Sequence, residues 1–305
     1  MIDIGADEAT TPSAAKRRMG AALKDARVNA GLSLDEAGSV IQRSAATLSR
    51  LERGRLQKPR VVDVTALLDH YIAVKPGSVD DTGRSQLLRL ARHAAEPAWF
   101  AEFRDVLGGP MTADDAQRYI EFENDASAIR TFEPEMMPGL LQTRGYAEAV
   151  VDAFFATYTA RERSRFVELR LARQQILDRS TDPLRFDVVL GEVALRRRVA
   201  SDDAMREQLQ FLLDHASGKR PHVSIRIAPI ELGHPALFGG PFVVMDLADP
   251  DENGLVYLET RAAPQFDQSD DVVDRYRQLH ANLSAAVLDT AQSRDLIEEV
   301  LNGLG

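Results

Sequence analysis

The stretch ATLSRLERGR, residues 46–55, carries the side chains with the clearest chemistry in this sequence. Its arginines, Arg50, Arg53 and Arg55, are permanently charged, and their planar donors fit phosphate groups and the guanine edge. They lie in an acidic chain of 305 residues with a formal net charge of -10. This local concentration of guanidinium groups indicates that the segment binds a polyanion.

The distribution of charge along the chain supports this interpretation. Residues 13–60 contain eleven Lys or Arg against four Asp or Glu, a net charge of +7, whereas residues 61–305 carry a net charge of -14. Residues 1–12 add -3, and we expect them to form a flexible acidic tail. A basic head on an acidic body predicts that the head alone contacts nucleic acid. A solvated charged surface without a partner is the alternative.

Other chemistry-bearing residues do not form a catalytic or metal-binding pattern. The chain has no cysteine, which excludes a thiol nucleophile and a cysteine-based metal site. His215, His222 and His234 lack metal-ligand spacing, and the acids of segment 121–125 alternate along a helix, which we interpret as a solvated surface. There is no nucleophile elbow and no phosphate-binding loop. We therefore expect no catalytic residue, no metal, no cofactor and no enzyme activity; an enzyme with a DNA-binding head is the remaining alternative.

The basic head has the pattern of short helices joined by tight turns. Apolar residues recur every three or four positions over residues 16–30, and Gly31 ends this first helix. Ser33 and Glu36 have the spacing of a capping box, which starts a second helix over residues 34–41. Ser44 is the expected N-cap of a third helix, residues 45–53, which ends at Gly54. A fourth and a fifth helix are expected within residues 61–73.

This order of elements predicts a helix-turn-helix. The segment NAGLSLDEAGSVIQRSAATLSRLERGR resembles the Xre family of lambda-repressor-like regulators, over about residues 18–73. The resemblance implies a five-helix DNA-binding domain, residues 13–74, whose third helix enters the major groove. It implies contacts with base edges from Ala45, Ala46, Thr47 and Arg50. Phosphate contacts are expected from Arg43, Ser44, Ser49, Arg53, Arg55, Arg17 and Arg18, with Lys16 at the edge.

Three positions in the head need a separate explanation. The resemblance implies that Glu52, an acid on the recognition helix, forms an internal ion pair with Arg27 of the first helix. Gly38 stands where the family usually has Ala, and weakens the second helix by up to about 1 kcal/mol. Gln42 stands where the family usually has Gly in the turn, at a similar cost if the backbone there is left-handed.

The rest of the chain predicts a larger α+β domain, residues 85–305, after a linker at residues 75–84 that is rich in Pro, Gly and Asp. Four short β-branched runs, at residues 185–190, 223–229, 241–246 and 255–259, predict a small antiparallel sheet. The expected helices cover residues 84–95, 97–107, 112–130, 143–156, 160–179, 191–199, 202–216, 269–289 and 292–302. The fold class is therefore mainly α.

The body also carries a family resemblance. The segment IEFENDASAIRTFEPEMMPGLLQTRGYAEAVV, residues 120–151, and later pieces such as LGEVALRRRV and GGPFVVMDL are similar to the Scr-type toxin–antitoxin-like regulators of actinobacteria. The resemblance implies a body that binds a small protein partner. For residues 138–143, PGLLQT, a turn with two core leucines and an N-cap at Thr143 is the structural alternative to a binding role.

Two functions remain open from the sequence. The first is a sequence-specific transcription regulator that binds double-stranded DNA as a homodimer on a two-fold operator. A partner or ligand that binds the acidic body would control it. The second is an antitoxin-like module that binds a small protein partner and uses DNA binding for autoregulation. The N-terminus has no signal-peptide layout and no run is long enough to span a membrane, so we expect a cytoplasmic protein.

Overall fold

The computed structural model describes residues 12–56, 58–96, 98–107, 113–179, 183–217, 220–247, 254–260 and 263–304. The expected tail at residues 1–12 lies outside this part except for its last residue. The chain divides into two compact units, a head up to Ala101 and a body from Glu102 onward.

The described part of the head contains five α-helices. They are α1 (Pro12–Asn29), α2 (Leu34–Val40), α3 (Ala45–Glu52), α4 (Val61–Val74) and α5 (Asp81–Ala94). Ser33 and Glu36 form the expected capping box, and Ser44 caps α3 by accepting from the Thr47 backbone N–H. Residues 61–74 form one helix rather than two, so the fifth helix lies further along the chain than expected.

Helix α5 belongs to the head because it shares the head's core. Leu87, Ala91 and Ala94 of α5 are buried in one apolar cluster with Met19 and Leu23 of α1. Asp80 caps α5 by accepting from the Gly83 backbone N–H at 2.7 Å, and Val79 is buried. Residues 75–84, expected to form a linker, are therefore a turn inside the head and the first residues of α5. The division between the units falls some twenty residues later.

The body is built on one six-stranded sheet. Its strands are β1 (Ala126–Glu133), β2 (Arg185–Gly191), β3 (Val223–Ala228), β4 (Phe242–Leu247), β5 (Leu255–Leu258) and β6 (Gln265–Asp267), in the order β3-β2-β1-β4-β5-β6. Strands β1, β2 and β3 are parallel, with Thr131 opposite Val188 and Val188 opposite Ile225. Strands β4, β5 and β6 continue the sheet in antiparallel pairs.

The expectation of an antiparallel sheet was wrong for half of the strands. Two strands, β1 and β6, were not expected. Strand β1 was missed because residues 112–130 were expected to form one helix. Helix α7 (Ala113–Asp125) instead ends at Asp125, and β1 follows without a break. Strand β1 is the central strand that pairs in parallel with β2 and antiparallel with β4, so the mixed sheet depends on it.

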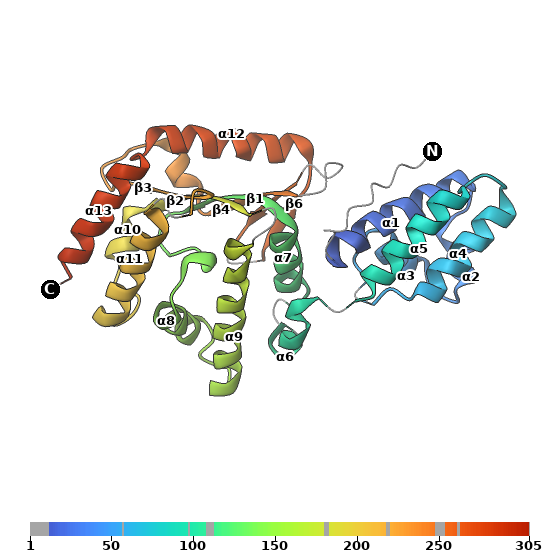
Figure 1. Ribbon diagram of the computed structural model, residues 1–305, viewed down its shortest axis with the longest axis horizontal. Coiled ribbons are helices and arrows are strands. Elements are labelled where there is room, and N and C mark those ends of the chain that lie inside the picture. Colours follow the sequence, from blue (N-terminus) through green and yellow to red (C-terminus); the bar gives the residue numbers. More distant parts are fainter. Residues whose placement is uncertain are drawn as a thin grey trace. The chain divides into compact units, whose positions relative to one another are not determined.

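Helices cover both faces of the sheet (Figure 1). Helix α12 (Asp270–Ala286) lies on one face, over a cluster that includes Phe132, Val189 and Val244. The larger core lies on the other face. It is covered by α7, α8 (Arg144–Phe154), α9 (Ala160–Arg173), α10 (Glu192–Arg196), α11 (Asp202–Ala216) and α13 (Thr290–Asn302). The remaining short elements are α6 (Arg104–Leu107) and the 3-10 turns Trp99–Phe103, Gly139–Leu141, Gln174–Asp178 and Pro235–Gly239.

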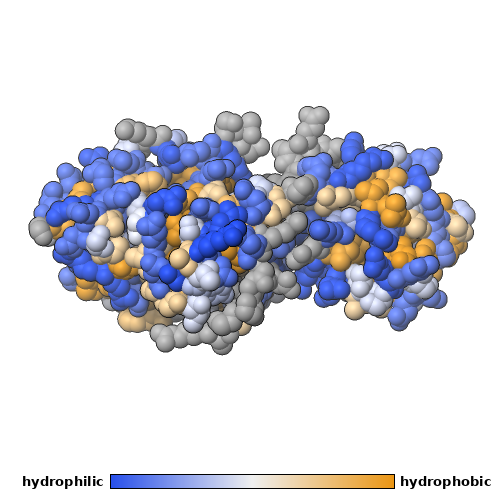
Figure 2. Space-filling model, turned by 90° about the horizontal axis from the view of Figure 1, so that it is seen from below, coloured by the Kyte–Doolittle hydropathy of each residue, from blue (hydrophilic) through white to orange (hydrophobic). Residues whose placement is uncertain are grey.

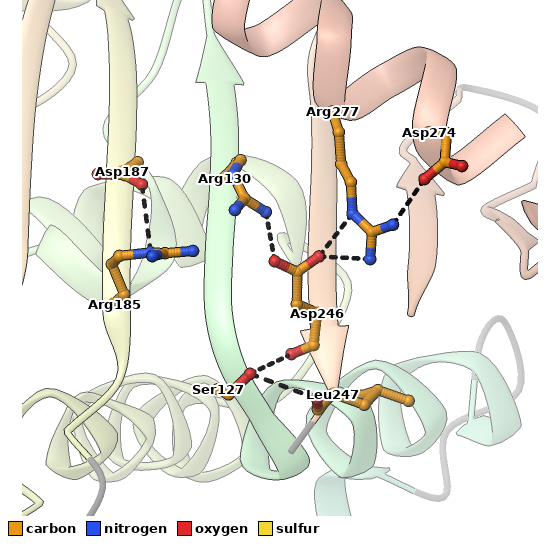
Figure 3. A network of polar contacts seen from close by, with 8 residues as sticks. All are labelled: Ser127, Arg130, Arg185, Asp187, Asp246, Leu247, Asp274 and Arg277. Carbon is orange, nitrogen blue, oxygen red and sulfur yellow. Dashed lines mark hydrogen bonds and ion pairs between the residues drawn. The ribbon is translucent and has the colours of Figure 1, made fainter. Parts of the chain in front are cut away.

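A charged network joins α12 to the sheet (Figure 3). The carboxylate of Asp246 on β4 accepts from Arg277 of α12 at 2.9 and 2.8 Å and from Arg130 of β1 at 2.5 Å. Arg277 also donates to Asp274 on its own helix at 2.7 Å. One carboxylate thus compensates two guanidinium groups, which connects two strands and the covering helix.

The segment PGLLQT has part of the structural role expected for it. Leu140 and Leu141 are buried in the larger core. Gln208 of α11, fully buried, donates to the Leu141 carbonyl and accepts from the Thr143 backbone N–H. Thr143 occupies the N-cap position of α8, but its side chain makes no capping hydrogen bond, contrary to expectation.

The surface is mostly hydrophilic on the face shown in Figure 2, with small separate hydrophobic patches. The most exposed large apolar side chains among the described residues are Phe238, Phe154 and Val62. No helix in the described ranges combines the length and apolar character needed to cross a bilayer.

Candidate nucleic-acid interface

The recognition helix α3 is positioned by a close crossing with α1. A Cβ atom added at Gly20 would lie 2.6 Å from the backbone oxygens of Leu51 and Glu52, so only glycine allows this approach. Gly54, with a φ of +65°, lies against the backbone of Arg17. Leu48 and Leu51 are buried, which fixes the rotation of α3 and turns Ala46 and Arg50 outward.

The expected ion pair between Arg27 and Glu52 is present. Arg27 donates from Nε to one carboxylate oxygen at 2.6 Å and from Nη2 to the other at 3.0 Å. Its Nη1 donates to the Leu32 carbonyl at 2.7 Å. Glu52 is the only acid in α3, and this pair turns it inward. The outer surface of the recognition helix therefore presents no carboxylate to a DNA phosphate.

The geometry of the turn between α2 and α3 explains Gly38 and Gln42, the two residues that differ from the family pattern. Gln42 has a φ of +54°, the left-handed conformation expected at this position. Gly38 allows the chain to fold back, because a Cβ atom there would lie 2.8 Å from the Arg43 carbonyl oxygen. The Gly38 carbonyl accepts from the backbone N–H groups of Ile41 and Arg43. The glycine thus provides space for the tight turn.

The residues expected to contact bases lie together on the outer side of α3. Ala46 and Arg50 are exposed, and Ala45 and Thr47 are half-buried. The Thr47 hydroxyl lies 3.0 Å from that of Ser44, which fixes both side chains at the start of the helix.

The residues expected to contact phosphates fall into two groups. Arg43, Ser44, Arg53 and Arg55 are exposed, and Ser49 is half-buried. Arg53 folds back and donates to the Ser49 carbonyl at 3.1 Å. On α1, Arg17 and Arg18 are half-buried and interact with other groups of the chain, and Lys16 is buried. Burial of Lys16 leaves little of its surface open to a phosphate. Its contact, like those of Arg17 and Arg18, stays a prediction.

A depression of about 240 Å³ lies beside α3. Thr47 and Arg50 line it together with Arg43, which brings a candidate phosphate contact next to two candidate base contacts. Lys58 and Arg60, from the segment before α4, line the same depression. Sequence reasoning missed these two residues because they follow the recognition helix in an irregular segment without a periodic pattern.

The depression has a positive balance of charge. Its only acid, Asp63, accepts from Arg60 at 2.9 and 2.5 Å and is thereby compensated. Arg43, Arg50 and Lys58 remain exposed, and none forms an ion pair with another residue in the described part of the head. Such a set of exposed donors on and beside a protruding helix fits the phosphates and base edges of duplex DNA.

The geometry defines a helix-turn-helix domain joined to an α+β body. Comparison with protein families agrees, because a model described as "Helix-turn-helix domain" matches residues 18–76. A second model, "Domain of unknown function (DUF5753)", matches residues 116–299, more than half of the chain. The chain therefore belongs to the DUF5753 family. No curated protein and no solved structure matches this chain at a significant level.

A metal site in the body would require several His, Asp or Glu side chains that lie close together. Among the described residues, no group of three or more His, Asp or Glu side chains is arranged to hold a metal ion. The acids of segment 121–125 are not a solvated surface as expected. Glu123 is buried and bonded to Arg173 at 2.7 Å through each of two donors, and Asp125 is buried as well.

Proposed function

We propose that this protein is a sequence-specific transcription regulator that binds a two-fold operator as a homodimer, with the acidic body as the point of control. The helix-turn-helix domain itself indicates DNA binding. The observation that carries the proposal is the charge pattern around α3. Its one acid is turned inward, while Arg43, Arg50 and Lys58 surround an open depression.

Within this proposal Arg50 has the specific role. An exposed arginine on the outer side of a recognition helix can donate two hydrogen bonds to guanine, worth about 1–3 kcal/mol of discrimination. Ala45, Ala46 and the Thr47 methyl group are suited to thymine methyl groups. Arg43, Ser44, Ser49, Arg53 and Arg55, with Arg17 and Arg18, position the helix through phosphates.

The test is fluorescence anisotropy of the full chain on DNA from upstream of its own gene and on scrambled DNA, at two salt concentrations. We expect the native site to bind about a thousandfold more tightly, and Arg50→Ala to lose about 1–3 kcal/mol of that preference. Lys24→Ala, which removes an exposed charge of α1 outside the depression, is the control. Equal binding to both DNAs, unchanged by Arg50→Ala, would reject this role.

A second function, an antitoxin-like module that binds a small protein, is favoured by one observation. Residues 61–305 carry a net charge of -14, which complements a basic partner. Purification of the tagged chain from its natural host tests this function. A small basic protein retained in a 1:1 ratio, and released by high salt, would support it. Recovery of the chain alone at native expression levels would argue against it.

A further inference from the structure

The hairpin formed by α8 and α9 carries an apolar tip, residues 149–160, which ends α8, connects the two helices and starts α9. Both helices lie on the side of the body away from α12 (Figure 1). Phe154, the last residue of α8, is 70% exposed, and Ala153, Ala156 and Ala160 around it are exposed as well. A group of neighbouring exposed apolar residues, unlike a single one, marks an interaction surface.

The tip has a defined shape because aromatic rings fill its inner side. Phe155 stacks on Phe166 of α9, with the ring centroids 4.6 Å apart and an angle of 14° between the planes. Tyr158 meets both rings edge-on, at 5.4 and 5.5 Å. Phe155 and Phe166 also pack against the small core between the two helices. A partner of Phe154 would therefore meet a preformed surface, which lowers the cost of ordering on binding.

The tip is almost free of charge in a chain that is otherwise rich in it. Asp152 is the only charged residue among residues 149–160, whereas 28% of the whole chain is charged. The Asp152 carboxylate is compensated by Arg163 of α9 at 2.8 Å. The centre of a protein–protein interface has this composition, with aromatic residues enriched and charged residues depleted.

The charge balance indicates which partner the tip fits. A basic protein requires free carboxylates, and the one carboxylate of the tip is already paired. Residues 61–305 carry a net charge of -14, which repels nucleic acid and anionic lipid and makes two copies of the body repel each other over most of their surface. An uncharged tip at the edge of the body is where two copies can approach without this cost. The tip therefore fits a second copy of the same chain.

We propose that the tip of the α8–α9 hairpin is the interface of the homodimer, with Phe154 of each copy packed against the tip of the other around a two-fold axis. A stable interface buries about 1,200–2,000 Å² in total, so the outer sides of α8 and α9 beside the tip also contribute. Exposed Glu148 and Arg161 then lie at the polar rim. This inference rests on the proposed function in one respect, the homodimer, and adds the surface through which it forms.

Sedimentation velocity of the full chain over a wide range of concentrations, without DNA, provides the test. We expect a monomer–dimer equilibrium whose dissociation constant rises at least about tenfold in Phe154→Ser, because each dimer loses two buried phenyl groups. Phe154→Leu, which keeps a large apolar side chain, should retain most of the affinity. Phe238→Ser, which removes a phenylalanine of the body that is 81% exposed in another segment, is the control and should change nothing.

A second measurement on the unaltered protein covers the case in which Phe154→Ser does not fold. Raising the salt concentration screens the repulsion between two acidic bodies and leaves an apolar contact intact, so the dimer should become tighter. A dimer held together by ion pairs would become weaker instead, and that result would overturn the proposal.

The remaining outcomes separate this interface from the proposed function. A chain that sediments as a monomer at every concentration would overturn both the interface and the homodimer. A dimer that Phe154→Ser leaves unchanged, or that Phe238→Ser weakens equally, would overturn the interface alone. Equal binding to native and scrambled DNA by a dimer that depends on Phe154 would reject the DNA function and leave the interface standing.

Discussion

The guanidinium group of Arg27 donates to both carboxylate oxygens of Glu52 and to the carbonyl of Leu32, so one side chain joins α1, α3 and the turn before α2. Both side chains are largely withdrawn from solvent, at 11% and 4% exposure. Within the helix-turn-helix this pair fixes the recognition helix against the first helix.

Removal of one partner should therefore cost more than removal of both. Arg27→Ala leaves a buried carboxylate without compensation, and we expect a loss of about 3–5 kcal/mol in the stability of the head. Hydrogen exchange of the α1 and α3 amides measures this directly. The double variant Arg27→Met with Glu52→Leu, which keeps the volume and removes both charges, should recover most of the loss. A double variant no more stable than Arg27→Ala would contradict this account.

Substitutions at two positions of the α2–α3 turn, Gly38 and Gln42, should change the stability of the head in opposite directions. Gln42→Gly should stabilise the head by about 1 kcal/mol, because glycine adopts a positive φ without strain. Gly38→Ala should destabilise it although alanine favours a helix, because the new methyl group would meet the Arg43 carbonyl oxygen at 2.8 Å. Thermal unfolding of both variants checks the signs. Stabilisation by Gly38→Ala would show that the turn can relax.

Lys58 should act as a phosphate contact rather than as a sequence reader. It lines the depression beside Arg50 but lies outside the recognition helix. We expect Lys58→Ala to weaken binding to native and to scrambled DNA by the same factor. The slope of log K against log salt concentration should fall by about one unit. Anisotropy titrations over a salt series measure both. A selective loss on the native site would instead indicate that Lys58 contacts a base.

His280 should make the body sensitive to acid. His280 is a buried residue of α12, and this burial lowers its pKa to about 4, from an ordinary value near 6.5. The unfolded chain therefore binds a proton between these values while the folded chain does not. Stability falls as the pH drops from 6.5 toward 4, by up to about 3 kcal/mol from this residue.

The matched variant for this effect is His280→Gln, which cannot titrate. Urea unfolding at several pH values measures the difference in unfolding free energy between the natural protein and His280→Gln. This difference should change by up to about 3 kcal/mol between pH 6.5 and pH 4. Carboxylates titrate in both proteins and cancel in the difference. A difference that stays constant with pH would contradict the low pKa.

The head could be predicted from its sequence in more detail than the body, for physical reasons. Capping by Ser33, Glu36 and Ser44 depends on residues three positions apart, so it can be predicted from the local sequence alone. The strand at residues 126–133 was missed because no Gly or Pro separates it from α7, and its first residues continue a helical pattern. Without it, the parallel pairing of β1 with β2 could not be inferred. The parallel pairing of β2 with β3 was missed although both strands were expected.

The residues of the candidate nucleic-acid interface differ in the same way. Thr47 and Arg50 lie one helical turn apart, and their proximity follows from the helix alone. Lys58 reaches the same depression only through the path of the chain after α3.

The packing of α5 determines where the chain can be truncated or cleaved without loss of the head's core. Since Leu87, Ala91 and Ala94 complete the core around α1, a fragment ending at residue 74 would leave Met19 and Leu23 partly uncovered. The shortest autonomous DNA-binding fragment therefore extends to at least Ala94. A protease that cleaves before α5 would inactivate the head, whereas cleavage beyond residue 101 would release it intact.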